Sequence, residues 1–179
     1  MNAAPASPRL QLLIVDANVL IDYAISDTSI LALVVKHIGP IHVPLPILEE
    51  VDQLTDADCA RLGITLLDPT LNELAAAAAL PQTTLSFEDK LCLVLAEANG
   101  FICVTNDKPL RVACEAAGVT PRWGLQLMSD LVAIHQLTPE AAVATARLIG
   151  AANPHITKAL LALFEKNVTT LHHHRRRSS

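Results

Sequence analysis

The sequence predicts an α/β protein with a mainly parallel central sheet, followed by additional helices at the C-terminal end. Up to about residue 122, short apolar runs rich in Val, Ile and Leu alternate with longer helical patterns, as expected for parallel strands buried on both faces. Beyond residue 123, one helical pattern follows another. Hydrophobic residues make up 51% of the chain and aromatic residues only 3%, which suits helices packed on a sheet better than an all-β sandwich.

Four strands and six helices are expected in the first part of the chain. The strands are short apolar runs at residues 10–15, 41–43, 63–67 and 101–104. The helices are expected at residues 19–24, 29–37, 44–54, 71–80, 87–99 and 108–117. Gly or Pro follows several of these helices, as is common where helices end. Because strands alternate with helices, right-handed crossovers make the sheet mainly parallel.

Three more helices are expected after Trp123, at residues 125–136, from Thr138 onward and at residues 155–167. No linker separates them from the preceding part. We therefore expect one domain at residues 10–122, with a helical extension of residues 123–170 packed on it. Residues 1–9 are expected to be a disordered lead-in, and residues 171–179, which contain His and Arg runs, a disordered tail.

The net charge and the expected cellular location of the protein restrict its possible functions. The formal net charge of −5 argues against a non-specific nucleic-acid binder, which usually carries a basic surface. If the protein acts on nucleic acid, it must use a small basic patch or metal ions. The first residues lack the pattern of a signal peptide, and no apolar run approaches the roughly 20 residues that span a bilayer. We expect a cytoplasmic protein without membrane contact, with Cys92, Cys103 and Cys114 as reduced core residues.

Four acidic residues lie where strands or helices are expected to begin or end. Asp16 directly follows an apolar run, Glu50 lies near the start of a helix, Asp89 opens the long helix at 87–99, and Asp107 follows the fourth strand. In a parallel sheet, the carboxyl ends of strands and the amino ends of the following helices share one edge. Asp16, Glu50 and Asp107 are thus candidates for one cluster, and Asp89 joins it if its helix begins on the same side.

A cluster of carboxylates has an evident chemical use. Its members repel one another, and divalent cations relieve that repulsion. All-oxygen ligands suit Mg²⁺ or Mn²⁺, which polarise a phosphodiester and help to generate hydroxide from water. The predicted reaction is hydrolysis of a phosphodiester without a covalent enzyme intermediate.

Each acidic residue also has a structural interpretation. Asp89 is placed to form a capping box with Ser86, and Asp107 to cap the following helix. Glu50 can be a solvated helix residue, and Glu49 competes with it for the inward direction. Asp16 is the hardest to explain structurally, because a buried charge needs a partner or a metal.

Four segments resemble, in order, the four acidic motifs of PIN-domain proteins. They are residues 15–20 (Val-Asp-Ala-Asn-Val-Leu), 43–51, 85–89 (Leu-Ser-Phe-Glu-Asp) and 104–107 (Val-Thr-Asn-Asp). The resemblance implies a three-layer α/β/α fold and a Mg²⁺- or Mn²⁺-dependent ribonuclease, of the kind that includes the VapC-like toxins of toxin–antitoxin pairs. By motif position, the catalytic metal ligands would be Asp16, Glu50, Asp89 and Asp107, with Asn18 and Thr105 as polar support.

The leading hypothesis is therefore a metal-dependent endoribonuclease that acts on RNA. Lys108 and Arg111 flank Asp107 and are candidates for contacts with substrate phosphates, although both also suit a solvated helix face. The alternative is an inactive PIN-fold module that binds protein or RNA. As partners, the resemblance also implies a cognate antitoxin or a homodimer.

Overall fold

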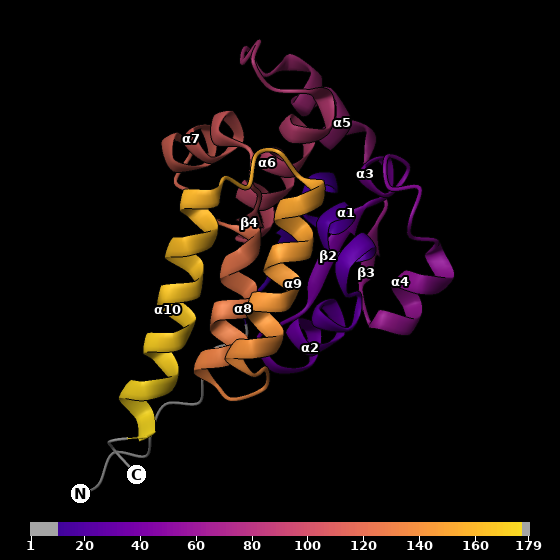
Figure 1. Ribbon diagram of the computed structural model, residues 1–179. Coiled ribbons are helices and arrows are strands. Elements are labelled where there is room, and N and C mark those ends of the chain that lie inside the picture. Colours follow the sequence, from indigo (N-terminus) through magenta and orange to yellow (C-terminus); the bar gives the residue numbers. More distant parts are fainter. Residues whose placement is uncertain (1–10, 177–179) are drawn as a thin grey trace, which may run out of the picture.

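The computed structural model describes residues 11–176, with a five-stranded sheet between layers of helices (Figure 1). Every strand pair is parallel, and the order across the sheet is β3-β2-β1-β4-β5. The predicted α/β architecture with a parallel central sheet is confirmed. The strands are β1 (Leu13–Val15), β2 (Ile41–Pro44), β3 (Thr65–Leu67), β4 (Ile102–Val104) and β5 (Pro121–Arg122).

Two layers of helices enclose the sheet. In one layer, α6 contacts β1 and β4, and α5 and α7 contact α6. In the other layer, α1 contacts α9, α2 contacts α8, and α8 contacts α9, while α10 packs on α8 and α9. The C-terminal helices therefore lie against the helices of the first part of the chain, as Figure 1 shows. The helices are α1 (Ala17–Ser26), α2 (Ser29–His37), α3 (Leu45–Leu48), α4 (Asp56–Leu62), α5 (Leu71–Ala79), α6 (Phe87–Asn99), α7 (Lys108–Ala116), α8 (Gly124–Ala133), α9 (Pro139–Ala152) and α10 (Lys158–Arg176).

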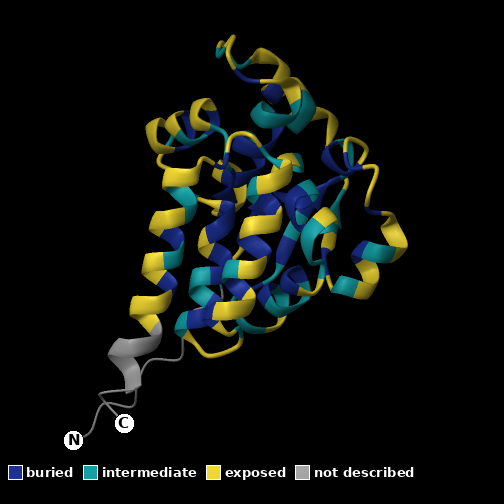
Figure 2. Cartoon of the chain, viewed as in Figure 1, coloured by how far each residue is buried: buried dark blue, intermediate teal, exposed yellow. Residues whose placement is uncertain are grey.

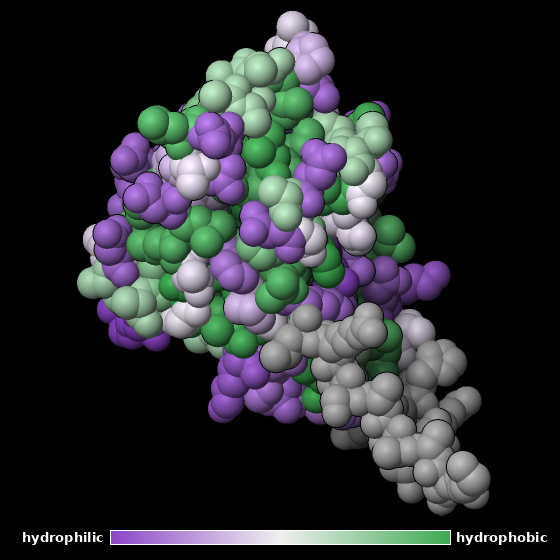
Figure 3. All heavy atoms as spheres, turned by 180° about the vertical axis from the view of Figure 1, so that it is seen from behind, coloured by the Kyte–Doolittle hydropathy of each residue, from purple (hydrophilic) through white to green (hydrophobic). Residues whose placement is uncertain are grey.

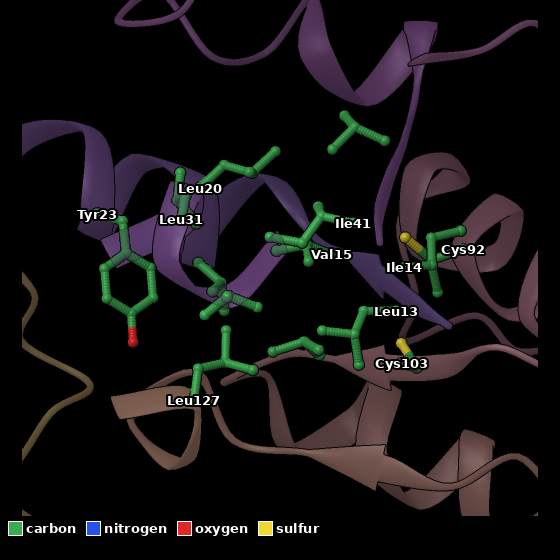
Figure 4. Packing of buried hydrophobic residues seen from close by; sticks show 14 of the residues in the cluster. Leu13, Ile14, Val15, Leu20, Tyr23, Leu31, Ile41, Cys92, Cys103 and Leu127 are labelled. Atoms are coloured by element: carbon green, nitrogen blue, oxygen red, sulfur yellow. The ribbon is translucent and has the colours of Figure 1, made fainter. Parts of the chain in front are cut away.

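Strand β1 is the centre of the hydrophobic core. Leu13, Ile14 and Val15 are fully buried, because β2 and β4 flank the strand and helices cover both of its faces. Figure 2 shows the buried residues in dark blue on the strands and on the inner helix faces. In Figure 4 the β1 side chains lie among those of α1, α2, β2 and α8, which include Tyr23 and Leu127.

The strand order places a topological switch point at the carboxyl end of β1. The chain passes from β1 to β2 on one side and, after β3, returns to β4 on the other side. Ligands of open α/β sheets bind in the crevice at such a point. Asp16 follows β1 directly, and its backbone N–H donates to the carbonyl of Val104 at the end of β4 (3.1 Å).

The helix expected at residues 44–54 is much shorter than predicted. Pro44 pairs with Leu67 in the sheet, so α3 begins at Leu45, and it ends at Leu48. The chain then forms tight turns, in which the N–H of Glu50 donates to the carbonyl of Ile47. Glu49 and Glu50 therefore lie in a turn and not one turn inside a helix.

Other differences concern short or terminal elements. Helix α4 and strand β5 were not expected, and α10 extends to Arg176, so that it includes part of the region expected to be a disordered tail. The expected lead-in at residues 1–9 and the last residues of the tail lie outside the described residues. The expected free cysteines are confirmed, since Cys92, Cys103 and Cys114 are buried and unbridged.

Within residues 11–176, no single helix is both long and apolar enough to cross a membrane; α1 and α2 meet that condition only together, as a pair bent by 118°. On the face seen in Figure 3, hydrophobic and hydrophilic residues are interspersed.

Gly39 occupies a position where the sheet leaves no room for a side chain. A Cβ atom at this residue would lie 2.0 Å from the carbonyl oxygen of Gln11, just before β1. We expect Gly39→Ala to destabilise the protein by at least about 3 kcal/mol, because backbone must move to admit the methyl group. Thermal unfolding followed by circular dichroism measures this change.

Gly118→Ala is the matched control for this prediction. Gly118 has a positive φ of 75°, but an added Cβ would meet no atom within 4 Å, so only conformational strain of about 1–2 kcal/mol is expected. If both variants lower the melting temperature equally, the close approach of residue 39 to Gln11 is wrong.

Candidate functional site

Three of the four predicted acidic residues line one pocket at the switch point. This acidic pocket has a volume of about 240 Å³. Asp16 contributes from the end of β1, Glu50 from the turn after α3, and Asp89 from the first turn of α6. Its other lining residues are Ala17, Asn18, Ile47, Ser86, Glu88 and Cys92. Helix α6 thus begins on the side of the sheet where β1 ends, which was the condition for Asp89 to join the cluster.

Asp16 is the most deeply placed of these acids, with 4% of its surface exposed. It is the N-cap of α1, and its Oδ1 accepts a hydrogen bond from the N–H of Val19 (2.8 Å). Its Oδ2 accepts from the hydroxyl of Thr105, which is fully buried after β4. Both oxygens are therefore fixed. Burial raises the pKa of Asp16 to about 7, and the negative charge of Asp89 adds to this shift. The hydrogen bonds from Thr105 and Val19 act in the opposite direction, because they stabilise the charged carboxylate.

Asp89 caps α6, as predicted, and also lines the acidic pocket. Ser86 and Asp89 form a capping box: the Ser86 hydroxyl accepts from the N–H of Asp89 (3.0 Å), and the Asp89 carboxylate accepts from the N–H of Ser86 (3.0 Å). Burial raises its pKa, the bonds to Ser86 oppose this shift, and the charges of Asp107 and Glu88 add to it.

Glu50, and not Glu49, lines the pocket, which answers the question that the sequence left open. Partial burial raises the pKa of Glu50, with further contributions from the negative charges of Glu88 and Asp89. Glu88 is a pocket residue that sequence reasoning missed. Its position directly before Asp89 was the available signal, but the capping-box pattern drew attention to Asp89 alone.

Asp107 lies beside the acidic pocket and does not line it. Its Oδ1 caps α7 by accepting from the N–H of Leu110 (2.7 Å), as predicted for an N-cap. Its backbone N–H donates to the Thr105 hydroxyl (3.0 Å), which in turn holds Asp16. Asp107 is thus linked to Asp16 through Thr105, and its charge acts on Asp89.

Asn18 and Thr105 were both predicted to support the acids, and the structure shows such a contact for Thr105. Thr105 donates directly to Asp16. Asn18 is exposed and lines both the acidic pocket and a second pocket on the side of α7. Lys108 and Arg111, the predicted phosphate contacts, line that second pocket and not the acidic one.

A second buried acid, Asp22, was missed by sequence reasoning. It lies in α1, is 4% exposed, and accepts hydrogen bonds from the side-chain amides of Asn106 (3.0 Å) and Asn153 (2.9 Å). Asn106 Oδ1 also accepts from the N–H of Gly124 (3.0 Å). Burial raises the pKa of Asp22, and the two amides oppose this shift. An acid within the apolar helix pattern of residues 19–24 was the signal that could have indicated it.

The donor set of the acidic pocket fits a hard divalent cation. Its four carboxylates supply oxygen, and the residues that line the pocket include no Lys, Arg or His to balance their charge. Among the residues that the structure describes, no three His, Cys, Asp or Glu side chains are gathered closely enough to hold one ion together. Mg²⁺ does not need such a group, since it commonly binds through one or two carboxylates and retains several waters.

Comparisons with protein-family models, with curated proteins and with solved structures found no match for this chain. The PIN-family resemblance therefore stays a prediction that rests on the four acidic segments.

Proposed function

We propose that the protein is a metal-dependent endoribonuclease that uses the acidic pocket to hydrolyse RNA. The observation that carries this proposal is Asp16, a buried carboxylate whose pKa is raised to about 7 and which shares its pocket with three further acids. Burial of a carboxylate costs free energy, and acids whose pKa is raised in this way are concentrated at functional sites. Its location at the switch point of a parallel sheet supports the same conclusion.

Asp16 and Asp89 are the first candidates to hold Mg²⁺ or Mn²⁺, because each has a carboxylate that a cap already holds in place. Glu50 and Glu88 add negative charge at the exposed side of the pocket, and Asp107 adds it from the start of α7. A bound divalent cation would neutralise the phosphate, stabilise the leaving oxygen and make a water molecule more acidic.

The residues of the chain orient the groups that take part. Thr105 and the N–H of Val19 fix the two oxygens of Asp16, so that the carboxylate does not rotate. Lys108 and Arg111 line the neighbouring pocket, and in this proposal they attract the phosphates that flank the cleaved bond. Hydrolysis of this type leaves a 5′-phosphate and a 3′-hydroxyl.

Incubation of the purified protein with mixed cellular RNA tests the proposal. We expect cleavage with Mn²⁺ or Mg²⁺, none with EDTA, and products that a 5′-phosphate-dependent exonuclease degrades. Cleavage of equal rate in EDTA would refute metal dependence. If the protein binds RNA but leaves it intact with either metal, the alternative of a binding module with the same fold is correct.

A further inference from the structure

A second pocket adjoins the acidic pocket and shares Asn18 with it. It has a volume of about 420 Å³ and lies between the start of α7 and the segment that joins α9 to α10. We call it the tryptophan pocket. Besides Asn18, the lining residues that matter for its chemistry are Asp107, Lys108, Arg111, Trp123, Asn153 and His155. Its position means that a polymer bound in the acidic pocket can continue into it.

Trp123 and Arg111 form a stacked pair in this pocket. The guanidinium carbon of Arg111 lies 3.5 Å from the centroid of the Trp123 ring, and Arg111 Nη1 donates to the carbonyl of Asn106 (2.9 Å). Trp123 is nevertheless 37% exposed, although apolar rings of this size are usually covered. Aromatic rings and Arg guanidinium planes are the surfaces on which proteins stack the bases of single-stranded RNA.

The cations of the tryptophan pocket form no ion pair, although the carboxylate of Asp107 also lines the pocket and its charge acts on Arg111 at longer range. Of the arginines with described side chains, Arg61, Arg122 and Arg147 each form an ion pair with an Asp or Glu. Within the described residues, neither Lys108 nor Arg111 has a carboxylate at ion-pair distance. Lys108 and Arg111 outnumber Asp107, the one carboxylate among the residues that line the pocket, and the remaining positive charge suits an anion such as phosphate.

The far wall of the pocket is held in place by the buried Asp22. Asn153 caps the end of α9, and its side-chain amide donates to both oxygens of Asp22 (2.9 and 3.1 Å). Asn153 Oδ1 accepts from the backbone N–H of His155 (2.9 Å), which fixes the turn that carries the His155 side chain. The same Asp22 accepts from Asn106 beneath Arg111. One buried acid therefore positions both walls, so the pocket is preformed.

We propose that the tryptophan pocket binds one nucleotide of single-stranded RNA next to the phosphate that the acidic pocket holds. The base stacks on the Trp123–Arg111 pair, and Lys108, Arg111 and His155 contact the backbone phosphate. The identification of RNA rests on the proposed function, whereas binding in the pocket is independent of cleavage. The pocket selects single strands, because a base must leave its duplex stack to reach the ring.

The single tryptophan of the chain gives a direct readout of this pocket. Trp123 fluorescence is measured while a short RNA is added in EDTA, which removes the divalent cation that the proposed cleavage needs. We expect saturable quenching by the single strand and weaker binding after the strand is annealed to its complement. A labelled oligonucleotide followed by fluorescence anisotropy reports binding when Trp123 itself is changed.

Variants of the pocket separate its role from general charge. We expect Trp123→Ala and Arg111→Ala each to weaken single-strand binding about tenfold or more, since each removes part of the stacking surface. Trp123→Phe should restore most of the affinity, and circular dichroism verifies that the variants fold. Lys36→Ala, which removes an exposed charge in α2, is the matched control and should bind as the wild type does.

The outcomes distinguish this proposal from the nuclease proposal. Equal binding by wild type, Trp123→Ala and Arg111→Ala, or equal affinity for single strand and duplex, would overturn the tryptophan pocket as a nucleotide site. A free nucleoside monophosphate that binds as tightly as the oligonucleotide would also overturn it as an RNA site. If pocket-dependent binding is found without metal-dependent cleavage, the pocket stands and the nuclease proposal fails.

Discussion

Asp16→Asn is expected to lower the Mn²⁺-dependent cleavage of RNA by roughly 1,000-fold. The substitution keeps the size of the side chain and an oxygen that accepts from the N–H of Val19, but it removes the charge that would hold the cation. Cleavage of a labelled RNA by equal amounts of folded protein measures the effect. Asp56→Asn is the matched control, because Asp56 is an exposed acid in the first turn of α4 that lines neither pocket.

The pH dependence of stability verifies that Asp16→Asn acts on the charge and not on folding. Burial raises the pKa of Asp16 from 3.8 to about 7, so the folded protein binds this proton more tightly than the unfolded chain does. The resulting stabilisation is complete below pH 3.8 and is lost as the pH rises through about 7. The asparagine variant lacks this loss. Its melting temperature should therefore fall less than that of the wild type between pH 5 and pH 8. The underlying difference in the free energy of unfolding is about 1.4 kcal/mol for each unit by which folding raises the pKa.

Two results would contradict this account of Asp16. If Asp16→Asn cleaves RNA as fast as Asp56→Asn does, Asp16 has no part in the reaction. If the variant melts far below the wild type at every pH, the carboxylate is needed for folding, and its loss of activity carries no information about the metal.

Asp89→Asn and Ser86→Ala are expected to separate the two roles of Asp89. The asparagine keeps an oxygen that can accept from the N–H of Ser86, so we expect little loss of stability but a loss of cleavage of about 100-fold or more. Ser86→Ala removes the hydroxyl that caps α6 and should cost about 0.5–2 kcal/mol while most of the activity per folded molecule remains. Thermal unfolding and cleavage rates are measured on both variants.

The opposite pattern would assign Asp89 a structural role only. In that case Asp89→Asn would unfold at a temperature as low as Ser86→Ala does, and its specific activity would stay at the wild-type level. The paired design is useful here because both residues belong to the same capping box and line the same pocket.

The features that the sequence predicted correctly are those with local causes. An apolar run followed by a carboxylate was enough to indicate β1 and Asp16, and a Ser three residues before an Asp was enough to indicate the start of α6. The shared edge of Asp16 and Glu50 followed from the general geometry of parallel sheets, whereas Asp89 was included only on the condition that α6 begins on the same side. Asp107 was expected at this edge too, but its side chain turns to the N–H of Leu110 and faces the neighbouring pocket.

The features that the sequence did not indicate depend on contacts between distant segments. Pro44 was read as the first residue of a helix, yet its pairing with Leu67 keeps it in β2 and delays α3. Strand β5 has only two residues and contains a proline, so it has no periodic pattern of its own. The partners of Asp22 lie 84 and 131 residues away, and no local pattern connects them.

The separation in sequence between contacting residues also affects the order in which the two pockets form during folding. Contacts between residues far apart in the chain form slowly, because a long loop must close before they can. The groups that line the acidic pocket all precede residue 93, and β4, which supports β1, ends at Val104. The tryptophan pocket, in contrast, needs Asn153 to reach Asp22. During synthesis the acidic pocket can therefore assemble while the C-terminal helices are still being made, and the tryptophan pocket is completed last.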